Sequence, residues 1–252
     1  MTQESETEQI IRKVSAVGNG AHVFAPREWL GNEVIIVRKP QKSIEEKILD
    51  LIFPYLKDIR GVYLYGSYAR GEAREDSDID LLLISNTKLK IKKEGYEIIA
   101  LKEEDIPKAI KISPLLIYSA FAEAKAIINL DLLEKVRDKY MPKLADFKEY
   151  ISETKKIITI NEELLDPYSI MLRLRGVYIF DLLIKEENYS NKKFISWLAK
   201  ELPAVHVRRV YDNYRAKKLT GKNTSISDDD LRGVLELLRK KTNELSNKME
   251  RK

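Results

Sequence analysis

The stretch that most constrains the fold of this 252-residue chain covers residues 61–84 and reads GVYLYGSYARGEAREDSDIDLLLI. Two short apolar runs, residues 62–65 and 81–84, are separated by a polar segment that begins with Gly66-Ser67. Short apolar runs bounded by turn residues predict buried strands. We therefore expect a strand, a sharp turn with a short helix, and a second strand.

Two acidic residues, Asp78 and Asp80, precede the second apolar run and flank Ile79. Side chains two apart on a strand point to the same face, so the two carboxylates are expected side by side. Neighbouring carboxylates repel each other unless a cation lies between them. Oxygen ligands at this spacing suit Mg²⁺ or Mn²⁺, which are bound by a few carboxylates and by substrate phosphates. Asp78 and Asp80 are therefore predicted metal ligands.

The first half of the same stretch has features of a phosphate-binding turn. Gly66 allows the backbone to turn sharply and to approach a ligand closely. Ser67 offers a hydroxyl and an N–H at a predicted helix start, because Ser is a frequent N-cap and helix N-termini attract phosphate. Arg70 follows one turn later and is predicted to reach a phosphate oxygen. The alternative interpretation is an ordinary hairpin with a solvated, charged turn.

A third carboxylate comes from Glu97, the acidic residue inside the predicted strand at 96–101. An ionised side chain in an otherwise apolar strand needs a partner or a metal. Phosphoryl transfer with two metals usually uses a third carboxylate to bind the catalytic metal and to accept the hydroxyl proton. Glu97 is therefore a predicted catalytic residue and metal ligand. The alternative places it on the exposed face of an edge strand.

One pattern in this stretch resembles the signature of the minimal nucleotidyltransferases in the DNA polymerase beta superfamily. It consists of Gly66-Ser67, ten further residues and then Asp78-x-Asp80. The resemblance covers about residues 43–129. It implies an α+β fold with a mixed sheet, and transfer of a nucleoside monophosphate to a hydroxyl with release of pyrophosphate. It further implies ATP or another NTP as substrate, and two Mg²⁺ ions held by Asp78, Asp80 and Glu97. In this family the third acid is more often Asp, so Glu97 departs from the usual pattern.

The resemblance leaves the acceptor open. Within the superfamily, the resemblance favours the protein adenylyltransferase antitoxins, which modify a hydroxyl of a toxin. A small-molecule acceptor of the aminoglycoside kind is the second alternative, and a nucleic acid end is the third. A different class of function is also compatible with the sequence, namely a non-catalytic DNA-binding regulator that keeps the fold.

The first 40 residues have a different sequence pattern from the rest of the chain. Residues 13–17 and 21–25 are predicted strands around the turn Gly18-Asn19-Gly20, residues 26–30 a helical turn, and residues 33–38 a third, β-branched strand. The pattern resembles the swapped-hairpin modules of AbrB-type transcription regulators, which form dimers and often bind DNA. The resemblance implies a homodimer and DNA as a partner. The alternative is a β appendage that packs on the catalytic domain or self-associates.

The predicted domains are therefore a β-hairpin module at 1–40, a nucleotidyltransferase domain at 41–130 and an all-helical domain at 131–252. We expect the helical domain to cover the active-site cleft and to select the acceptor. Within it, residues 206–215 interleave cations and aromatic side chains on a predicted helix. This segment could face a nucleotide, or it could be a solvated basic face with tyrosines packed beneath.

Composition excludes several classes of chemistry. The chain has no cysteine, so disulfides, thiolate catalysis and zinc–thiolate sites are excluded. No apolar run is long enough to cross a membrane, and the first residues lack the apolar core of a signal peptide. We therefore expect a cytoplasmic protein. The net charge of +5 is compatible with polyanionic partners without requiring them. The abundance of Lys, Glu and Ile hints at a thermophile.

Overall fold

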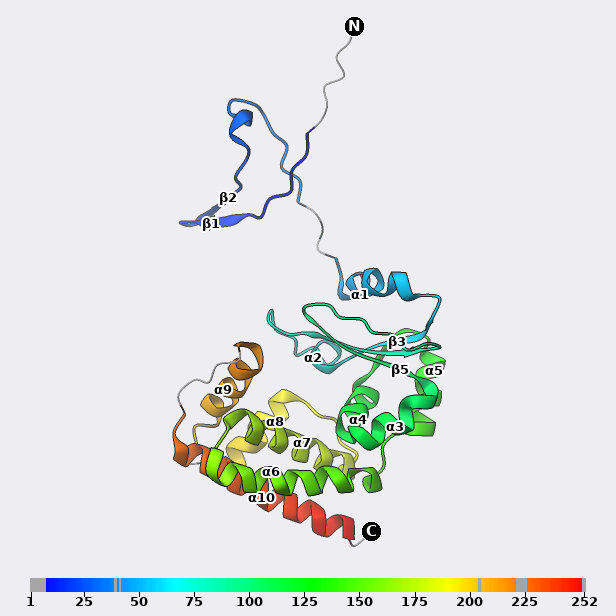
Figure 1. Ribbon diagram of the computed structural model, residues 1–252. Helices are drawn as coiled ribbons and strands as arrows, with labels where there is room; N and C mark the ends of the chain where they lie inside the picture. Colours follow the sequence, from blue (N-terminus) through cyan, green and yellow to red (C-terminus); the bar gives the residue numbers. More distant parts are fainter. Residues whose placement is uncertain (1–7, 39, 41, 204, 221–225, 251–252) are drawn as a thin grey trace. The chain divides into compact units, whose positions relative to one another are not determined.

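The computed structural model describes residues 8–38, 40, 42–203, 205–220 and 226–250, with the side chains of 218–220 left out. The chain divides into two compact units, residues 1–44 and 45–252. The first unit contains a two-stranded antiparallel sheet of β1 (Ser15–Val17) and β2 (Gly20–His22) (Figure 1). A single 3-10 turn, η1 (Arg27–Trp29), follows it. The predicted hairpin is confirmed, with shorter strands than expected.

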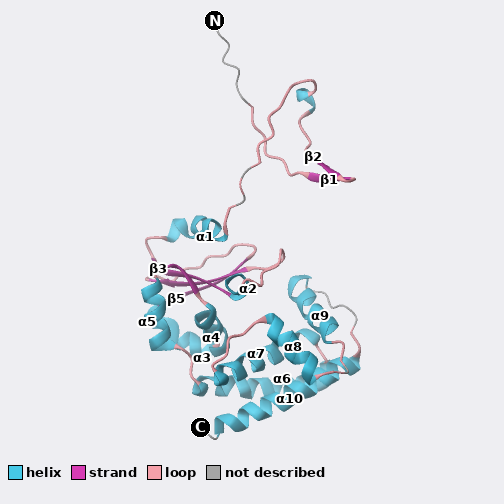
Figure 2. Cartoon of the chain, turned by 180° about the vertical axis from the view of Figure 1, so that it is seen from behind, coloured by secondary structure: helices cyan, strands magenta, loops and turns pink. Residues whose placement is uncertain are grey.

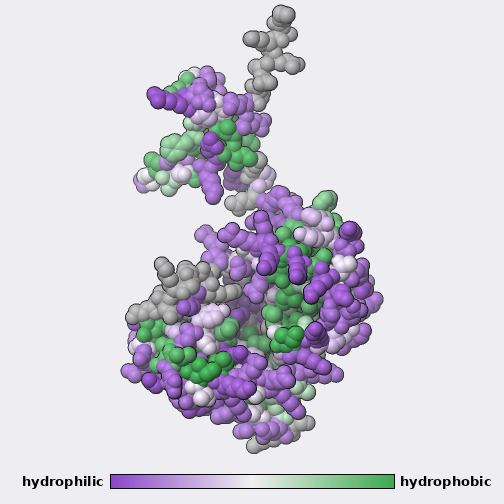
Figure 3. Space-filling model, in the orientation of Figure 1, coloured by the Kyte–Doolittle hydropathy of each residue, from purple (hydrophilic) through white to green (hydrophobic). Residues whose placement is uncertain are grey.

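The third strand predicted in this unit, at residues 33–38, does not form. A strand needs a neighbouring strand to pair its backbone N–H and C=O groups, and β1 and β2 pair only with each other. The segment has no regular secondary structure, and its apolar side chains lie in solvent, from 52% exposure for Val34 to 92% for Ile35. Among the described residues at 8–38, none is buried, and Figure 3 shows apolar side chains on the surface of this unit.

The second unit is built on a four-stranded mixed sheet with the order β5-β4-β3-β6. Its strands are β3 (Ile59–Tyr65), β4 (Ile79–Ser85), β5 (Tyr96–Lys102) and β6 (Lys125–Ile128). Strand β3 runs antiparallel to β4 and β6, whereas β4 and β5 are parallel. The predicted fold, a mixed sheet with helices behind an N-terminal hairpin and before a helical region, is confirmed.

Helices cover both faces of this sheet (Figures 1 and 2). Helix α1 (Ile44–Ile52) lies on one face, and α3 (Ile106–Ile112), α4 (Pro114–Glu123) and α5 (Leu130–Tyr140) lie on the other. Side chains alternate between the two faces of a strand, so Tyr63, Tyr65, Leu82 and Ile84 lie on the face that α3, α4 and α5 cover. They form one core cluster with these helices.

Two apolar segments of this region each form more than one element. In the segment at 43–59, α1 ends at Ile52, a 3-10 turn η2 (Phe53–Tyr55) contains Pro54, and β3 already begins at Ile59. Proline removes a backbone donor and ends the regular helix. The apolar run at 114–128 forms α4 and then β6. A short apolar run does not distinguish a helix from a strand, and here pairing with β3 decides.

The rest of the chain is helical over the residues that the structure describes. After α5 it comprises η4 (Leu144–Phe147), α6 (Lys148–Leu164), α7 (Pro167–Lys185), α8 (Asn191–Glu201), α9 (Val207–Thr220) and α10 (Asp228–Glu250), whereas the 3-10 turn η3 (Glu103–Asp105) leads from β5 into α3. A second core cluster joins these helices, with Phe147 stacked on Phe180 at a ring-centroid distance of 4.4 Å. None of the described helices has the length and apolar character that crossing a membrane requires.

Candidate active site

A cleft of about 690 Å³ lies between one end of the sheet and the helical region. Its walls come from β3, the short helix α2 (Gly66–Arg70), the loop that leads to β4, and helices α4 and α7 to α9. The six residues that the sequence singled out all line this cleft: Gly66, Ser67, Arg70, Asp78, Asp80 and Glu97.

The strand register brings the predicted acids together. Asp80 is the antiparallel partner of Tyr65 on β3 and the parallel partner of Glu97 on β5, so the three residues form one row across the sheet. Register partners project from the same face. Asp78 lies one residue before β4, and Ile79 between the two aspartates is buried. Glu97 is exposed on an edge strand, as the alternative interpretation expected, yet it lies beside Asp80.

The donor set fits a hard divalent cation. Carboxylate oxygens are the protein ligands that Mg²⁺ takes, usually one or two of them together with substrate phosphates. Asp78 and Asp80 would supply such oxygens in the cleft, with Glu97 next to them. In the described part of the chain, no group of three or more Asp, Glu, His or Cys side chains is arranged to hold a metal ion by itself. The carboxylates of Asp78, Asp80 and Glu97 would therefore need oxygen atoms of the substrate to complete the coordination of a metal ion.

Gly66 makes a close approach that only glycine allows. Its φ is +71°, and a Cβ at this position would overlap the carboxylate of Asp80. The turn thus holds α2 directly against the aspartate. The prediction that Ser67 is the N-cap was wrong in detail. The N-cap is Tyr65, without a side-chain cap, and Ser67 lies inside the first turn of α2. The extended backbone of β3 runs directly into the helix, so the cap falls on the last residue of the strand, two positions before Ser67.

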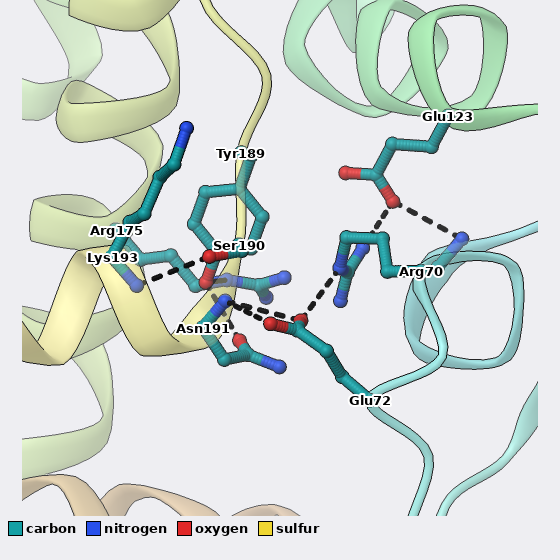
Figure 4. Close-up of polar contacts among 9 residues, drawn as sticks. Arg70, Glu72, Glu123, Arg175, Tyr189, Ser190, Asn191 and Lys193 are labelled. Carbon is teal, nitrogen blue, oxygen red and sulfur yellow. Dashed lines mark hydrogen bonds and ion pairs between the residues drawn. The ribbon is translucent and has the colours of Figure 1, made fainter.

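Arg70 is held between two carboxylates (Figure 4). Its Nε donates to Glu72 at 2.9 Å, and its Nη1 contacts Oε2 of Glu123. The backbone N–H of Gly66 donates to the same Oε2 atom at 3.1 Å. Two residues that the sequence assigned to nucleotide binding, Gly66 and Arg70, therefore donate to one carboxylate oxygen. Glu123 is a site residue that sequence reasoning missed, because nothing in its local sequence indicates a contact with residues 66 and 70.

The electrostatics differ between these two carboxylates. Burial raises the pKa of Glu123, and the nearby guanidinium groups of Arg70 and Arg175 offset this rise only in part. Burial also acts to raise the pKa of Glu72, but hydrogen bonds from Arg70 and from the N–H of Asn191 outweigh it, so the net pKa is lowered. Glu123 therefore takes up a proton more readily than Glu72 does.

Tyr65 is a further buried polar group at the site. Burial, together with the charges of Asp80, Glu97 and Glu123, raises the pKa of its phenol well above the usual value. Its hydroxyl is buried and has no hydrogen-bond partner among the described residues. Tyr65 thus presents a protonated hydroxyl beside the row of acids.

Comparison with known proteins agrees with this geometry. Residues 46–132 match the family model described as "Polymerase beta, Nucleotidyltransferase". Residues 46–132 are a nucleotidyltransferase domain of the DNA polymerase beta type. The match includes all six of the predicted site residues and ends before the helical region.

Two relatives extend the comparison. A protein of Methanocaldococcus jannaschii, whose name assigns it provisionally to the protein adenylyltransferases, is 41% identical over 46 residues, which are 18% of this chain. The chain spans about half (46%) of the length of this curated relative. The crystal structure of a spectinomycin adenyltransferase from Enterococcus faecialis, with ATP and spectinomycin, aligns with a TM-score of 0.52 and 14% identity. It covers 78% of this chain and 97% of its own, so the likeness in fold extends beyond the nucleotidyltransferase domain.

The helical region contacts the nucleotidyltransferase domain through the loop between α2 and β4. Glu72 accepts the N–H of Asn191, with both carboxylate oxygens at 3.1 Å (Figure 4). Asp76 forms a bidentate ion pair with Nη2 of Arg215, at 2.8 and 3.0 Å. The loop that precedes the two aspartates is thus fixed at two points to helices α8 and α9.

Behind these contacts lies a small polar network that sequence reasoning also missed. Arg175 of α7 donates to the hydroxyl of Tyr189 at 2.8 Å, and this hydroxyl donates to Oδ1 of Asn191 at 2.8 Å. Burial acts to lower the pKa of Arg175, but the hydroxyls of Tyr189 and Tyr214 more than offset it, so the pKa is raised and the cation persists. The basic, aromatic segment 206–215 fits both of its interpretations, because Tyr211 and Tyr214 are buried while Arg215 lines the cleft.

Proposed function

We propose that this protein is a Mg²⁺-dependent nucleotidyltransferase that moves AMP from ATP to a hydroxyl acceptor and releases pyrophosphate. The observation that carries the proposal is the row of Tyr65, Asp80 and Glu97 across three strands, at the edge of one cleft with Gly66 and Ser67. The family match of residues 46–132 supports the same reaction class.

In the proposed reaction, the acceptor oxygen attacks the α-phosphorus of the NTP. The bond between this phosphorus and the bridging oxygen then breaks, and pyrophosphate leaves. Asp78 and Asp80, with Glu97, would hold the divalent ion, which supplies charge neutralisation at the phosphates. Glu97 takes the proton of the acceptor hydroxyl. Ser67 and the backbone N–H groups of α2 contact the phosphates, and Arg70 adds positive charge beside them. Catalysis of this kind is mainly positioning and charge stabilisation.

Our leading acceptor is the hydroxyl of a protein side chain. The support is the similarity to the M. jannaschii relative, whose name refers to protein adenylylation. An aminoglycoside-like small molecule is the alternative, because the spectinomycin adenyltransferase shares the fold. A nucleic acid end is the third alternative. The cysteine-free composition supports a cytoplasmic location, and the high content of Lys and Glu is compatible with a thermophilic source.

We further propose that the first unit pairs with a second copy of itself. None of its described residues at 8–38 is buried, and the unpaired segment at 33–38 carries four consecutive exposed apolar residues, Val34 to Val37. A segment of this size rarely folds without burying apolar surface. Light scattering of the full chain tests the dimer. A salt-dependent gel shift of the full chain tests the rival function, a DNA-binding regulator.

The decisive experiment for the reaction uses labelled ATP. The full chain is incubated with labelled ATP, Mg²⁺ and each class of acceptor, and mass spectrometry identifies any adenylylated product. The proposal expects a Mg²⁺-dependent adduct on a hydroxyl and an equal amount of pyrophosphate. If no acceptor is labelled and the chain binds no Mg²⁺–ATP, the proposal is wrong.

A further inference from the structure

One carboxylate oxygen is bound to both ends of helix α2. Oε2 of Glu123 accepts the N–H of Gly66 at 3.1 Å and also contacts Nη1 of Arg70 (Figure 4). Gly66 is the first residue of α2 and Arg70 is the last. Glu123 comes from another part of the chain, at the end of α4. The turn that the sequence assigns to nucleotide binding is thus bound to an anion of the protein itself.

This contact uses the donors that a phosphate would need. A backbone amide has a single N–H, and the N–H of Gly66 is directed at Glu123. The guanidinium group of Arg70 donates through Nε to Glu72 at 2.9 Å and through Nη1 to Glu123. Carboxylate and phosphate oxygens accept hydrogen bonds from such donors in similar geometry. A phosphate bound to this turn would therefore compete with the carboxylate of Glu123.

The competing pair lies in the lining of the cleft, and little water screens it. The side chains of Glu123 and Arg70 are each 11% exposed, and both line the cleft. Arg70 does not depend on Glu123 alone, because Glu72 and the ring of Tyr189 also hold it. The centroid of this ring lies 5.1 Å from Cζ of Arg70, within the range of a cation–π contact. The arginine can therefore keep its place when a phosphate takes over from Glu123.

The position of Glu123 makes its carboxylate dependent on the donors of α2. Glu123 is the last residue of α4, and the C-terminal end of a helix carries a partial negative charge that disfavours a carboxylate. Burial raises the pKa of Glu123, and the guanidinium groups of Arg70 and Arg175 offset this rise only in part. The carboxylate loses its main stabilisation when another anion takes these donors.

We infer that Glu123 is an internal competitor of the triphosphate, which sets the nucleotide affinity of α2 by holding the N–H of Gly66 and the guanidinium group of Arg70. The inference rests on the proposed function and adds a control of affinity to it. Glu123 acts through these two residues and takes no part in the chemical step. When a phosphate binds, the hydrogen bonds of both donors pass from Glu123 to the phosphate oxygens.

The opposite role of Glu123 would give a change of opposite sign. If the carboxylate served only to hold α2 in the orientation that binds phosphate, its removal would misplace the turn and weaken binding. Removal of a competitor instead frees the donors and strengthens binding, because a larger fraction of the molecules is ready to bind. The sign of the change in affinity therefore separates the two roles.

Two variants of Glu123 measure this sign in graded steps. Glu123→Gln keeps the shape and an acceptor oxygen but removes the charge, whereas Glu123→Leu removes both the charge and the acceptor. Isothermal titration calorimetry of the full chain gives the Kd for tripolyphosphate, Mg²⁺–ATP and adenosine. We expect the two phosphate ligands to bind about threefold more tightly to the Gln variant and about tenfold more tightly to the Leu variant than to the wild type. Adenosine has no phosphate, so its affinity should not change.

Glu72→Gln is the matched control. It removes a negative charge from the same arginine but leaves Glu123 on the N–H of Gly66. We therefore expect a smaller gain in affinity for tripolyphosphate than in Glu123→Gln. Equal gains would show that only the charge beside Arg70 matters, and would overturn the inference. Circular dichroism checks the fold of each variant, and the shape-preserving Gln variant decides the question if the Leu variant does not fold.

The inference and the proposed reaction fail in different ways. Weaker or unchanged binding of tripolyphosphate by the folded Gln variant would overturn the inference, while nucleotide transfer by the wild type would still uphold the reaction. Tight binding of Mg²⁺–ATP without transfer to any acceptor would contradict the reaction, and the order of affinities among the variants would still decide the inference. If neither the wild type nor any variant binds tripolyphosphate or Mg²⁺–ATP, both are wrong.

Discussion

Asp80 and Glu97 lie side by side as register partners of parallel strands β4 and β5, although a loop of ten residues connects the two strands. Sheet pairing therefore places a residue of an edge strand in the lining of the cleft. The exposure of Glu97 is compatible with the proton-accepting role that we propose for its carboxylate.

The first prediction concerns Glu97. In Glu97→Gln the carboxylate is lost while the shape of the side chain stays, so we expect nucleotide transfer to fall by about 10²–10⁴-fold. Binding of Mg²⁺–ATP should change much less, because Asp78 and Asp80 remain. Glu94→Gln, at an exposed position in the loop before β5, is the control and should keep full activity. Equal activity of both variants would show that Glu97 does not take the proton.

The second prediction uses two glycines with the same backbone conformation. Gly66 and Gly71 both have φ of +71°, but only at Gly66 would a Cβ meet the carboxylate of Asp80, whereas at Gly71 it would meet nothing within 4 Å. Both alanine variants should lose about 1–2 kcal/mol of stability from backbone strain. Gly66→Ala should lose activity as well, because Asp80 is displaced. Denaturant unfolding and transfer assays separate the two effects, and an active Gly66→Ala enzyme would contradict the close approach that we describe.

The third prediction is a pH dependence that arises from Glu72. Its pKa in the folded state is lowered below the ordinary value of 4.5. A lowered pKa adds stability at pH values above 4.5, and this stability is lost as the pH falls through the folded-state pKa. The difference in unfolding free energy between the wild type and Glu72→Gln should therefore be largest above pH 4.5 and shrink on acidification. A difference that grows as the pH falls would contradict this assignment.

The fourth prediction concerns the ion pair between Asp76 and Arg215, which joins the loop before the aspartates to α9. Both side chains are partly exposed, so Arg215→Gln should cost less than about 1 kcal/mol of stability. We expect the KM for nucleotide or acceptor to rise, because the loop is no longer held in place. Arg239→Gln removes a comparable pair with Glu162, away from the cleft, and should leave the kinetics unchanged. Identical kinetics of both variants would show that the pair has no role in positioning.

The local parts of the site were predictable from sequence because their signals are local. Short apolar runs and turn residues around 61–84 predicted strand, turn and strand, and the structure has β3, α2 and β4 there. The spacing of Asp78 and Asp80 predicted a shared orientation, and both residues line the cleft. Residues close in sequence are placed by backbone periodicity alone, so no tertiary information was needed.

The parts of the site that the sequence did not predict depend on contacts between segments far apart in the chain. Glu123 meets Arg70 across 53 positions, and Glu72 meets Asn191 across 119 positions. No pattern within either segment indicates such a pair. The same reason explains why the third strand predicted at 33–38 does not form, since its β-branched residues favour a strand but pair with none of the described strands. Pairing, and not propensity, decides whether such a segment becomes a strand.

The most direct test of the central claim is the binding of Mn²⁺–ATP, followed by electron paramagnetic resonance of the Mn²⁺ ion. The wild type is compared with the double variant Asp78→Asn/Asp80→Asn, after circular dichroism has shown that both are folded. Our account predicts saturable binding by the wild type, and loss of both this binding and nucleotide transfer in the double variant. A folded double variant that still binds Mn²⁺–ATP and transfers nucleotide would contradict the account.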